Sequence, residues 1–88
     1  MVTPGEDGNA FADWDDTPRA LRYHVELQIV GVDLDFRRVA TVTDSDATIT
    51  GLPSGATVRV RVLAVNDAGN GPPSGVVEVV LLVEPVGP

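Results

Sequence analysis

The sequence predicts an all-β protein, a sandwich of short antiparallel strands, and three observations support this fold class. The β-branched residues, 16 Val, 7 Thr and 2 Ile, make up 25 of the 88 residues, and such side chains suit a pleated sheet better than a helix. Two segments, 21–30 and 57–66, alternate between apolar and polar residues, as half-buried strands do. The 9 Gly and 7 Pro fall mostly into short segments between apolar runs, which is typical of turns.

Six strands are expected in chain order, and no segment shows the period of a helix. The first strand covers 10–14. A turn follows because the residue before Pro18 is disfavoured in the α region. The second strand covers 21–30, with Tyr23 and Val25 on its buried face. The other strands are expected at 36–42, 47–50, 57–66 and 76–83.

Length and charge limit the classes of protein. A chain of 88 residues forms one domain, which we expect at 10–84, after a polar lead-in or rudimentary strand at 1–9 and before a linker-like tail at 85–88. The net charge of −7 excludes nucleic acid and anionic membranes as expected partners. Without Cys there are no disulfides and no thiol catalysis. The longest apolar run, 79–83, is too short to span a membrane.

No arrangement of residues predicts an enzyme or a cofactor. His24 is the only His, and it is expected to point outward from its strand, whereas Ser45, Ser54 and Ser74 fall in turns. Nucleophilic catalysis would need a Ser beside the His. Segment 66–71 is rich in Gly and Asn but lacks the Lys and the following helix of a phosphate loop.

The acidic residues are interpreted as turn residues. Asp starts turns and caps them through its side chain, and a sandwich of this size has no cleft for two facing catalytic carboxylates. Calcium remains an alternative, although no EF-hand loop pattern is present, so no metal site is predicted. The outward Arg59 and Arg61 are expected to form cross-strand ion pairs with Glu26 and His24. The acidic clusters are Asp13, Asp15 and Asp16, Asp33 and Asp35, and Asp44 and Asp46.

Four pieces of the sequence carry a resemblance to a known family. They are Trp14, 20–26 (ALRYHVE), 49–55 (ITGLPSG) and 60–74 (VRVLAVNDAGNGPPS). In this order they resemble the strands and turns of a fibronectin type III domain, especially of the bacterial and phage kind. The resemblance covers about residues 10 to 82. It implies an immunoglobulin-like β-sandwich of six to seven antiparallel strands in two sheets.

The resemblance also implies a core signature and shows two departures from the family. The family usually has a Tyr six residues after the Leu of one turn; counted from Leu52, that place holds Val58. Only 13 residues precede Trp14, so the family's first strand is either short, Met1 to Pro4 at most, or missing. A missing strand would leave neighbouring sheet edges unpaired. The core signature consists of Trp14, Tyr23, Val25, Leu52, Val60, Val62 and Ala64.

An apolar strip is expected on the outer face of one sheet. If Val77, Val79 and Leu81 face the core, the alternate residues of the last strand face solvent beside those of its neighbour. A contiguous apolar strip beside an open edge indicates a protein contact. A different register, or cover by the N-terminal segment, would remove it. The strip comprises Leu63, Val65, Val76, Val80 and Leu82.

Three functional hypotheses follow. The first is a non-catalytic structural or interaction module, a spacer or docking domain of a larger extracellular or cell-surface bacterial protein. It would contact a protein partner or a neighbouring domain through the last strand, and self-association is a further prediction. The second is a phage virion subunit, a decoration or tail protein that docks through an open sheet edge. The third is a carbohydrate-binding accessory module, for which the only aromatic residues are Phe11, Trp14, Tyr23 and Phe36.

Overall fold

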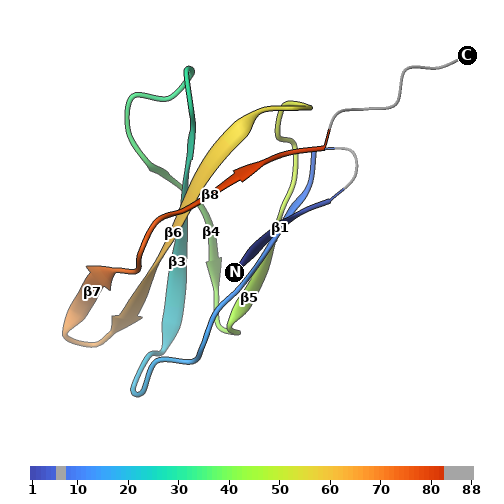
Figure 1. Cartoon of the computed structure of the whole chain (residues 1–88). Helices are drawn as coiled ribbons and strands as arrows, with labels where there is room; N and C mark the ends of the chain where they lie inside the picture. The colour runs from blue at the N-terminus through green and yellow to red at the C-terminus, as the bar shows by residue number, and fades with distance from the viewer. Residues whose placement is uncertain (6–7, 83–88) are drawn as a thin grey trace, which may run out of the picture.

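A computed structural model of the protein describes residues 1–5 and 8–82, which form two antiparallel β-sheets (Figure 1). The described part of the chain contains no helix that could span a membrane. The pairing of the described strands into two antiparallel sheets confirms the predicted all-β sandwich. The smaller sheet has the order β1 (Val2–Pro4), β2 (Ala10–Asp13), β5 (Asp46–Ile49). The larger sheet begins with the order β4 (Arg37–Val42), β3 (Arg22–Ile29), β6 (Thr57–Asn66). Both β7 (Gly69–Pro73) and β8 (Val77–Val80) pair with the edge of β6 that faces away from β3.

The two long alternating segments become the central pair of the larger sheet. In the register of β3 and β6, Val25 lies opposite Val62 and Leu27 opposite Val60. Along β3, every second residue from Tyr23 to Ile29 is buried, and the residues between them are partly exposed. This period of two is what a sheet with one covered face requires.

The core lies between the two sheets. It combines small residues of the smaller sheet, such as Ala10 and Ala47, with the larger side chains of β3 and β6. Leu81, which follows β8, closes the core and is only 2% exposed. Leu52 joins it from the turn before β6. Val58 stands where the family usually has its corner Tyr, and it is completely buried. An aliphatic side chain therefore packs into the core at that position.

Residues 67–75 lie between the strands expected at 57–66 and 76–83, where no strand was expected, and they contain strand β7. Its register places Asn70 opposite Val65 and Gly69 opposite Asn66. Ladder pairing uses backbone N–H and C=O groups, which Gly and Asn also supply, so composition concealed this strand. Gly69 has a φ of 116°, which allows the tight return of the chain after β6.

The N-terminal segment forms the short strand rather than leaving the sheet edge bare. In β1, Val2 lies opposite Ala12 and Pro4 opposite Ala10, so β1 covers the edge of β2. The strand predicted to start at Phe36 starts one residue later in the structure, since β4 begins at Arg37. The predicted last strand at 76–83 is shorter in the structure, where β8 covers Val77–Val80 and residues 81 and 82 follow outside any strand. Residue 83, the domain end at 84 and the tail at 85–88 lie outside the described residues.

The core signature forms in part. Tyr23, Val25, Leu52 and Val60 are buried, and Trp14 is partly buried against the core, its ring 5.4 Å from that of Tyr23 in an edge-on arrangement. Trp14 lies one residue beyond β2. The remaining two members, Val62 and Ala64, are half-buried and line a surface hollow.

Candidate docking surface

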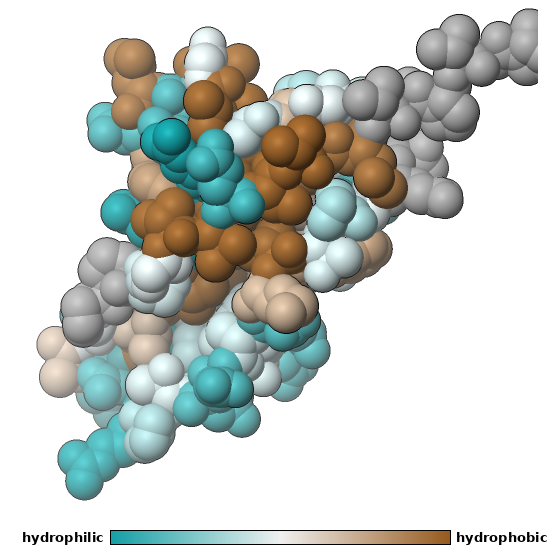
Figure 2. Space-filling model, viewed as in Figure 1, coloured by the Kyte–Doolittle hydropathy of each residue, from teal (hydrophilic) through white to brown (hydrophobic). Residues whose placement is uncertain are grey.

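An apolar surface surrounds strand β8 at the edge of the larger sheet. Val76, Val77, Val80 and Leu82 are 52%, 39%, 61% and 48% exposed, respectively. Figure 2 shows apolar side chains gathered over this part of the molecule. We call these four residues the apolar edge surface. In the register with β6, Val77 lies opposite the buried Val60, whereas Val80 lies opposite Thr57 on the other face of the strand, so exposed aliphatic side chains flank β8 on both faces. Large apolar side chains that gather in solvent around one strand are of the kind that marks protein contacts.

The apolar edge surface differs from the predicted strip in three members. Val65 is only 6% exposed, so it is not part of a contact strip. The reason is its central place in the sheet, between Arg22 of β3 and Asn70 of β7, beside a register shift that interrupts the alternation. Leu63 is half-buried. Conversely, Val77 was expected to face the core, and it lies opposite the buried Val60, but it stands at the start of β8 and is 39% exposed.

The backbone of β8 is open on one side within the described residues. Its only paired neighbour there is β6, with Val58 opposite Val79 and Thr57 opposite Val80. In an antiparallel edge strand, alternate residues direct their N–H and C=O groups away from the sheet. An extended segment of another chain can satisfy those groups by adding a strand. The surface therefore offers both apolar contacts and a hydrogen-bonding edge.

The polar residues singled out in the sequence form a separate cluster on β3, β4 and β6. Arg61 Nε lies 2.7 Å from Glu26 Oε1, and the Arg61 guanidinium lies 4.2 Å from the centre of the Phe36 ring. His24 Nε2 is 3.3 Å from Arg38 Nη1. The predicted cross-strand ion pair thus forms for Arg61, whereas His24 contacts an arginine of β4 rather than one of β6. Among the described residues, no group of three potential metal ligands comes together.

Sequence reasoning missed two other features, an exposed turn tip and a hollow. The turn after β3 carries Val32 and Leu34, which are 70% and 95% exposed. At the other end of β3, Trp14 and Tyr23 line a hollow of about 390 Å³. The sequence did indicate the exposed turn, because Val32 and Leu34 alternate with Asp residues there. The hollow had no sequence signal, because it depends on how β7 and the segment after β2 sit on the larger sheet.

Comparison with known proteins identifies the fold. No protein-family model matches the chain, and no curated protein matches it. Solved structures do match: the fn3 domain of human contactin 1 has a TM-score of 0.84 at 22% identity, over 100% of this chain and 76% of that one. The FN5 domain of Drosophila Lar has a TM-score of 0.78 at 21% identity, over 93% and 89%. The chain therefore has the fibronectin type III fold that its sequence predicted.

Longer chains also contain the matching fold. The kinase region of twitchin from C. elegans has a TM-score of 0.75 at 20% identity, over 89% of this chain. This chain spans only 14% of the length of that twitchin region. The fold thus occurs there as one unit of a larger polypeptide.

Proposed function

We propose that this protein is a non-catalytic structural and interaction module that docks on a protein partner or a neighbouring domain through the apolar edge surface. The exposed strand β8 carries this proposal, because Val77 and Val80 are exposed on a strand whose outer edge has no described neighbour. Strand addition at such an edge gives affinity through the backbone and selectivity through alternate side chains.

The proposed setting is a larger extracellular or cell-surface bacterial protein in which the domain acts as a spacer or dock. The sequence resemblance to the bacterial kind of fibronectin type III domain supports this setting. The acidic, Lys-free composition supports a well-solvated module. Similar folds stand as single units in longer chains, as in the twitchin kinase region.

A phage virion subunit is the second candidate, and the open edge of β8 favours it equally, since a decoration or tail protein would use such an edge as a clip. The aromatic residues give no support to carbohydrate binding. Phe11 lies on the smaller sheet and Phe36 borders the larger one, while Tyr23 is buried. Trp14 and Tyr23 do meet at a hollow, but edge-on, with their ring planes 68° apart, so the four aromatic side chains do not form one flat platform on which sugar rings could stack.

Site-specific photo-crosslinking in the native parent protein tests the proposed dock. A photoreactive residue replaces Val80, and the matched control carries it at Thr48, an exposed position of β5 in the other sheet. We expect the Val80 position to crosslink to one defined peptide, and the added substitution Val77→Lys to abolish that product. Equal yields from both positions, or no product from either, would overturn the docking proposal.

The location of the crosslinked product decides between the two settings. Recovery from the secreted or cell-surface fraction of a bacterium supports the extracellular module. Recovery only from purified phage particles overturns that setting in favour of the virion subunit. Circular dichroism of the Val77→Lys variant checks that loss of the product does not come from unfolding.

A further inference from the structure

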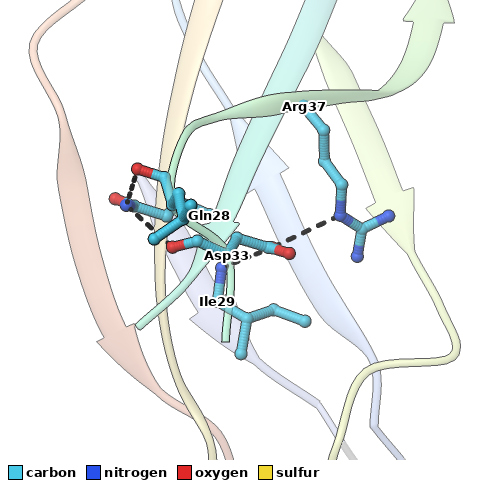
Figure 3. Close-up of polar contacts among 5 residues, drawn as sticks. Gln28, Ile29, Asp33 and Arg37 are labelled. Carbon is cyan, nitrogen blue, oxygen red and sulfur yellow. Dashed lines mark hydrogen bonds and ion pairs between the residues drawn. The ribbon is translucent and has the colours of Figure 1, made fainter. Parts of the chain in front are cut away.

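The larger sheet ends in two edge strands of different character, β4 and β8. Among the described residues, β4 pairs only with β3, and it begins with two arginines. Arg37 Nε lies 3.3 Å from Asp33 Oδ2 (Figure 3). The same oxygen accepts the backbone N–H of Ile29 at 2.9 Å, which lowers the pKa of Asp33 and keeps its carboxylate charged beside Arg37. Charged side chains along an edge of this kind discourage the addition of a strand.

Strand β8 is the edge that can accept another strand, and the hydrogen bonds around it show which backbone groups are available. Leu81 N–H donates to the carbonyl oxygen of Ala56, on the side of β6. Backbone groups alternate in direction along a strand, so those of Glu78 and Val80 point away from β6. In agreement, the carbonyl of Thr57, which lies opposite Val80, accepts a hydrogen bond from the residue that follows β3. The outer edge therefore presents the N–H and C=O groups of Glu78 and Val80.

The smaller sheet does not take up these backbone groups. Its edge strand β1 lies beside β8, but within the described part of the chain β1 pairs with β2 alone. An added strand would therefore continue the larger sheet beyond β8. On the core side, its side chains would lie next to Val77, which is 39% exposed, and Val79. Aliphatic side chains at these places would bury apolar surface.

The other face of β8 carries an unpaired charge. Glu78 lies opposite Arg59 of β6, and Arg59 lies opposite Gln28 of β3, so these three residues form one row across the sheet. Gln28 is neutral, and its amide group donates to the turn after β3 (Figure 3). Glu78 is exposed, and its carboxylate forms no ion pair among the described residues. The next place in this row belongs to the added strand.

We propose that the partner of the apolar edge surface is an extended segment in which a Lys or Arg stands between two aliphatic residues, and that it pairs with β8 with this cation beside Glu78. The inference rests on the proposed function, since it names the chemistry of the partner that docks there. Opposite charges on neighbouring strands attract, whereas like charges repel. The net charge of −7 adds a long-range attraction for a basic segment.

Strand β6 shows the pattern that pairs with β8. An aliphatic, a basic and an aliphatic residue of β6 face three successive residues of β8. The added strand meets the same three residues from the other side, so the same alternation suits it. The pattern is symmetric about its basic residue and therefore fits either strand direction. The three pairs in the register of β6 and β8 are Val58 with Val79, Arg59 with Glu78, and Val60 with Val77.

A second copy of β8 is a poorer occupant. The two-fold pairings that keep both core faces on one side centre either on Glu78 or on a valine of the strand. The first kind places two Glu78 side chains directly opposite each other, which is destabilising. The second kind sets Glu78 opposite Val76 or Val80 and leaves its charge without a partner. Each copy also carries −7, so two copies repel each other at low ionic strength.

NMR titration of the purified, isotope-labelled chain with synthetic peptides tests the proposal. The first peptide copies residues 57–62 (TVRVRV), and the second replaces both arginines by glutamate (TVEVEV). A third holds the residues of the first in the blocked order RRTVVV. For the basic peptide, we expect shifts of the backbone amide signals of Glu78 and Val80, and an affinity that falls as salt is added. The other two peptides should bind roughly three- to tenfold more weakly.

A charge swap separates the role of Glu78 from effects on the fold. Glu78→Lys should weaken binding of the basic peptide roughly three- to tenfold and strengthen binding of the acidic peptide by a similar factor. An unfolded variant could not show that gain. Asp44→Lys is the matched control, because it makes the same change of net charge at an exposed position between β4 and β5. It should bind the basic peptide as the wild type does.

Three outcomes overturn the proposal and are distinct from failure of the dock itself. Equal binding of the basic and acidic peptides, or equal losses in Glu78→Lys and Asp44→Lys, removes the cation from the partner while β8 remains a dock. Shifts of Glu78 and Val80 that grow with protein concentration, without peptide, assign the edge to a second copy. If no peptide shifts β8 but Val80 still gives its crosslinked product, the partner has another chemistry. If that product is missing too, the dock fails as well.

Discussion

Replacing Leu27 by Ala should destabilise the domain by about 3–4 kcal/mol. Leu27 is 0% exposed and lies on β3 opposite Val60. The substitution removes three buried carbon atoms, worth about 2.4 kcal/mol at ~0.8 kcal/mol each. The cavity left in the packed core raises the cost into the ~2–5 kcal/mol range measured for Leu→Ala. For a chain of 88 residues the total stability is about 4–13 kcal/mol, so this one change removes a large share.

Urea unfolding followed by Trp14 fluorescence measures the effect. The midpoint should fall while the slope with urea stays unchanged, and the melting temperature should drop by more than about 10 °C. Leu34→Ala is the matched control, because Leu34 is 95% exposed in the adjoining turn and its change should stay within about 0.5 kcal/mol. If Leu27→Ala costs less than about 1 kcal/mol, or the control costs as much, the core assignment is wrong.

Three further predictions concern the turns and the outer sheet face. Asp33→Asn should lower the melting temperature most above pH 4 and progressively less as the pH falls, because a pKa lowered from the ordinary value of 3.8 stabilises the fold only while the carboxylate is charged; a pH-independent difference would contradict this. Gly8→Ala should destabilise more than Gly51→Ala in thermal melts, since both residues have positive φ but only a Cβ at Gly8 would collide with a backbone carbonyl; equal losses would argue against it. A double-mutant cycle of Glu26→Gln and Arg61→Met should give a coupling of about 0.2–1 kcal/mol that shrinks in salt, and zero coupling at low salt would remove the pair as a stabilising contact.

Sequence patterns predicted strands well where side chains decided the structure and poorly where the backbone decided it. The alternation of 21–30 and 57–66 reflects one buried face; β3 follows it throughout, and β6 follows it from Thr57 to Val60. The sequence pattern did not predict strand β7, because its Gly and Asn residues pair through the backbone alone. Val65 was placed on the outside by alternation, yet neighbouring strands on both sides shield it.

The candidate surfaces divide in the same way. The last strand was recognised as a source of exposed apolar residues, and Val76, Val80 and Leu82 are indeed exposed. Val77 joins the apolar edge surface because the smaller sheet covers β8 incompletely. No local sequence pattern encodes that cover. The exposed turn after β3 was present in the sequence as an ordinary turn. Its rigidity depends on hydrogen bonds from Gln28 and to Asp33 that only the folded hairpin aligns.

By itself, the sequence determined the class of fold and the identity of the central strands. Hydrophobic periodicity is a local property, and it specifies which face of a strand must avoid water. The tertiary structure alone decided which apolar residues remain in solvent and where the hollow opens. Those outcomes depend on the register and coverage of strands far apart in the chain, because burial is a property of the neighbours that a residue acquires on folding.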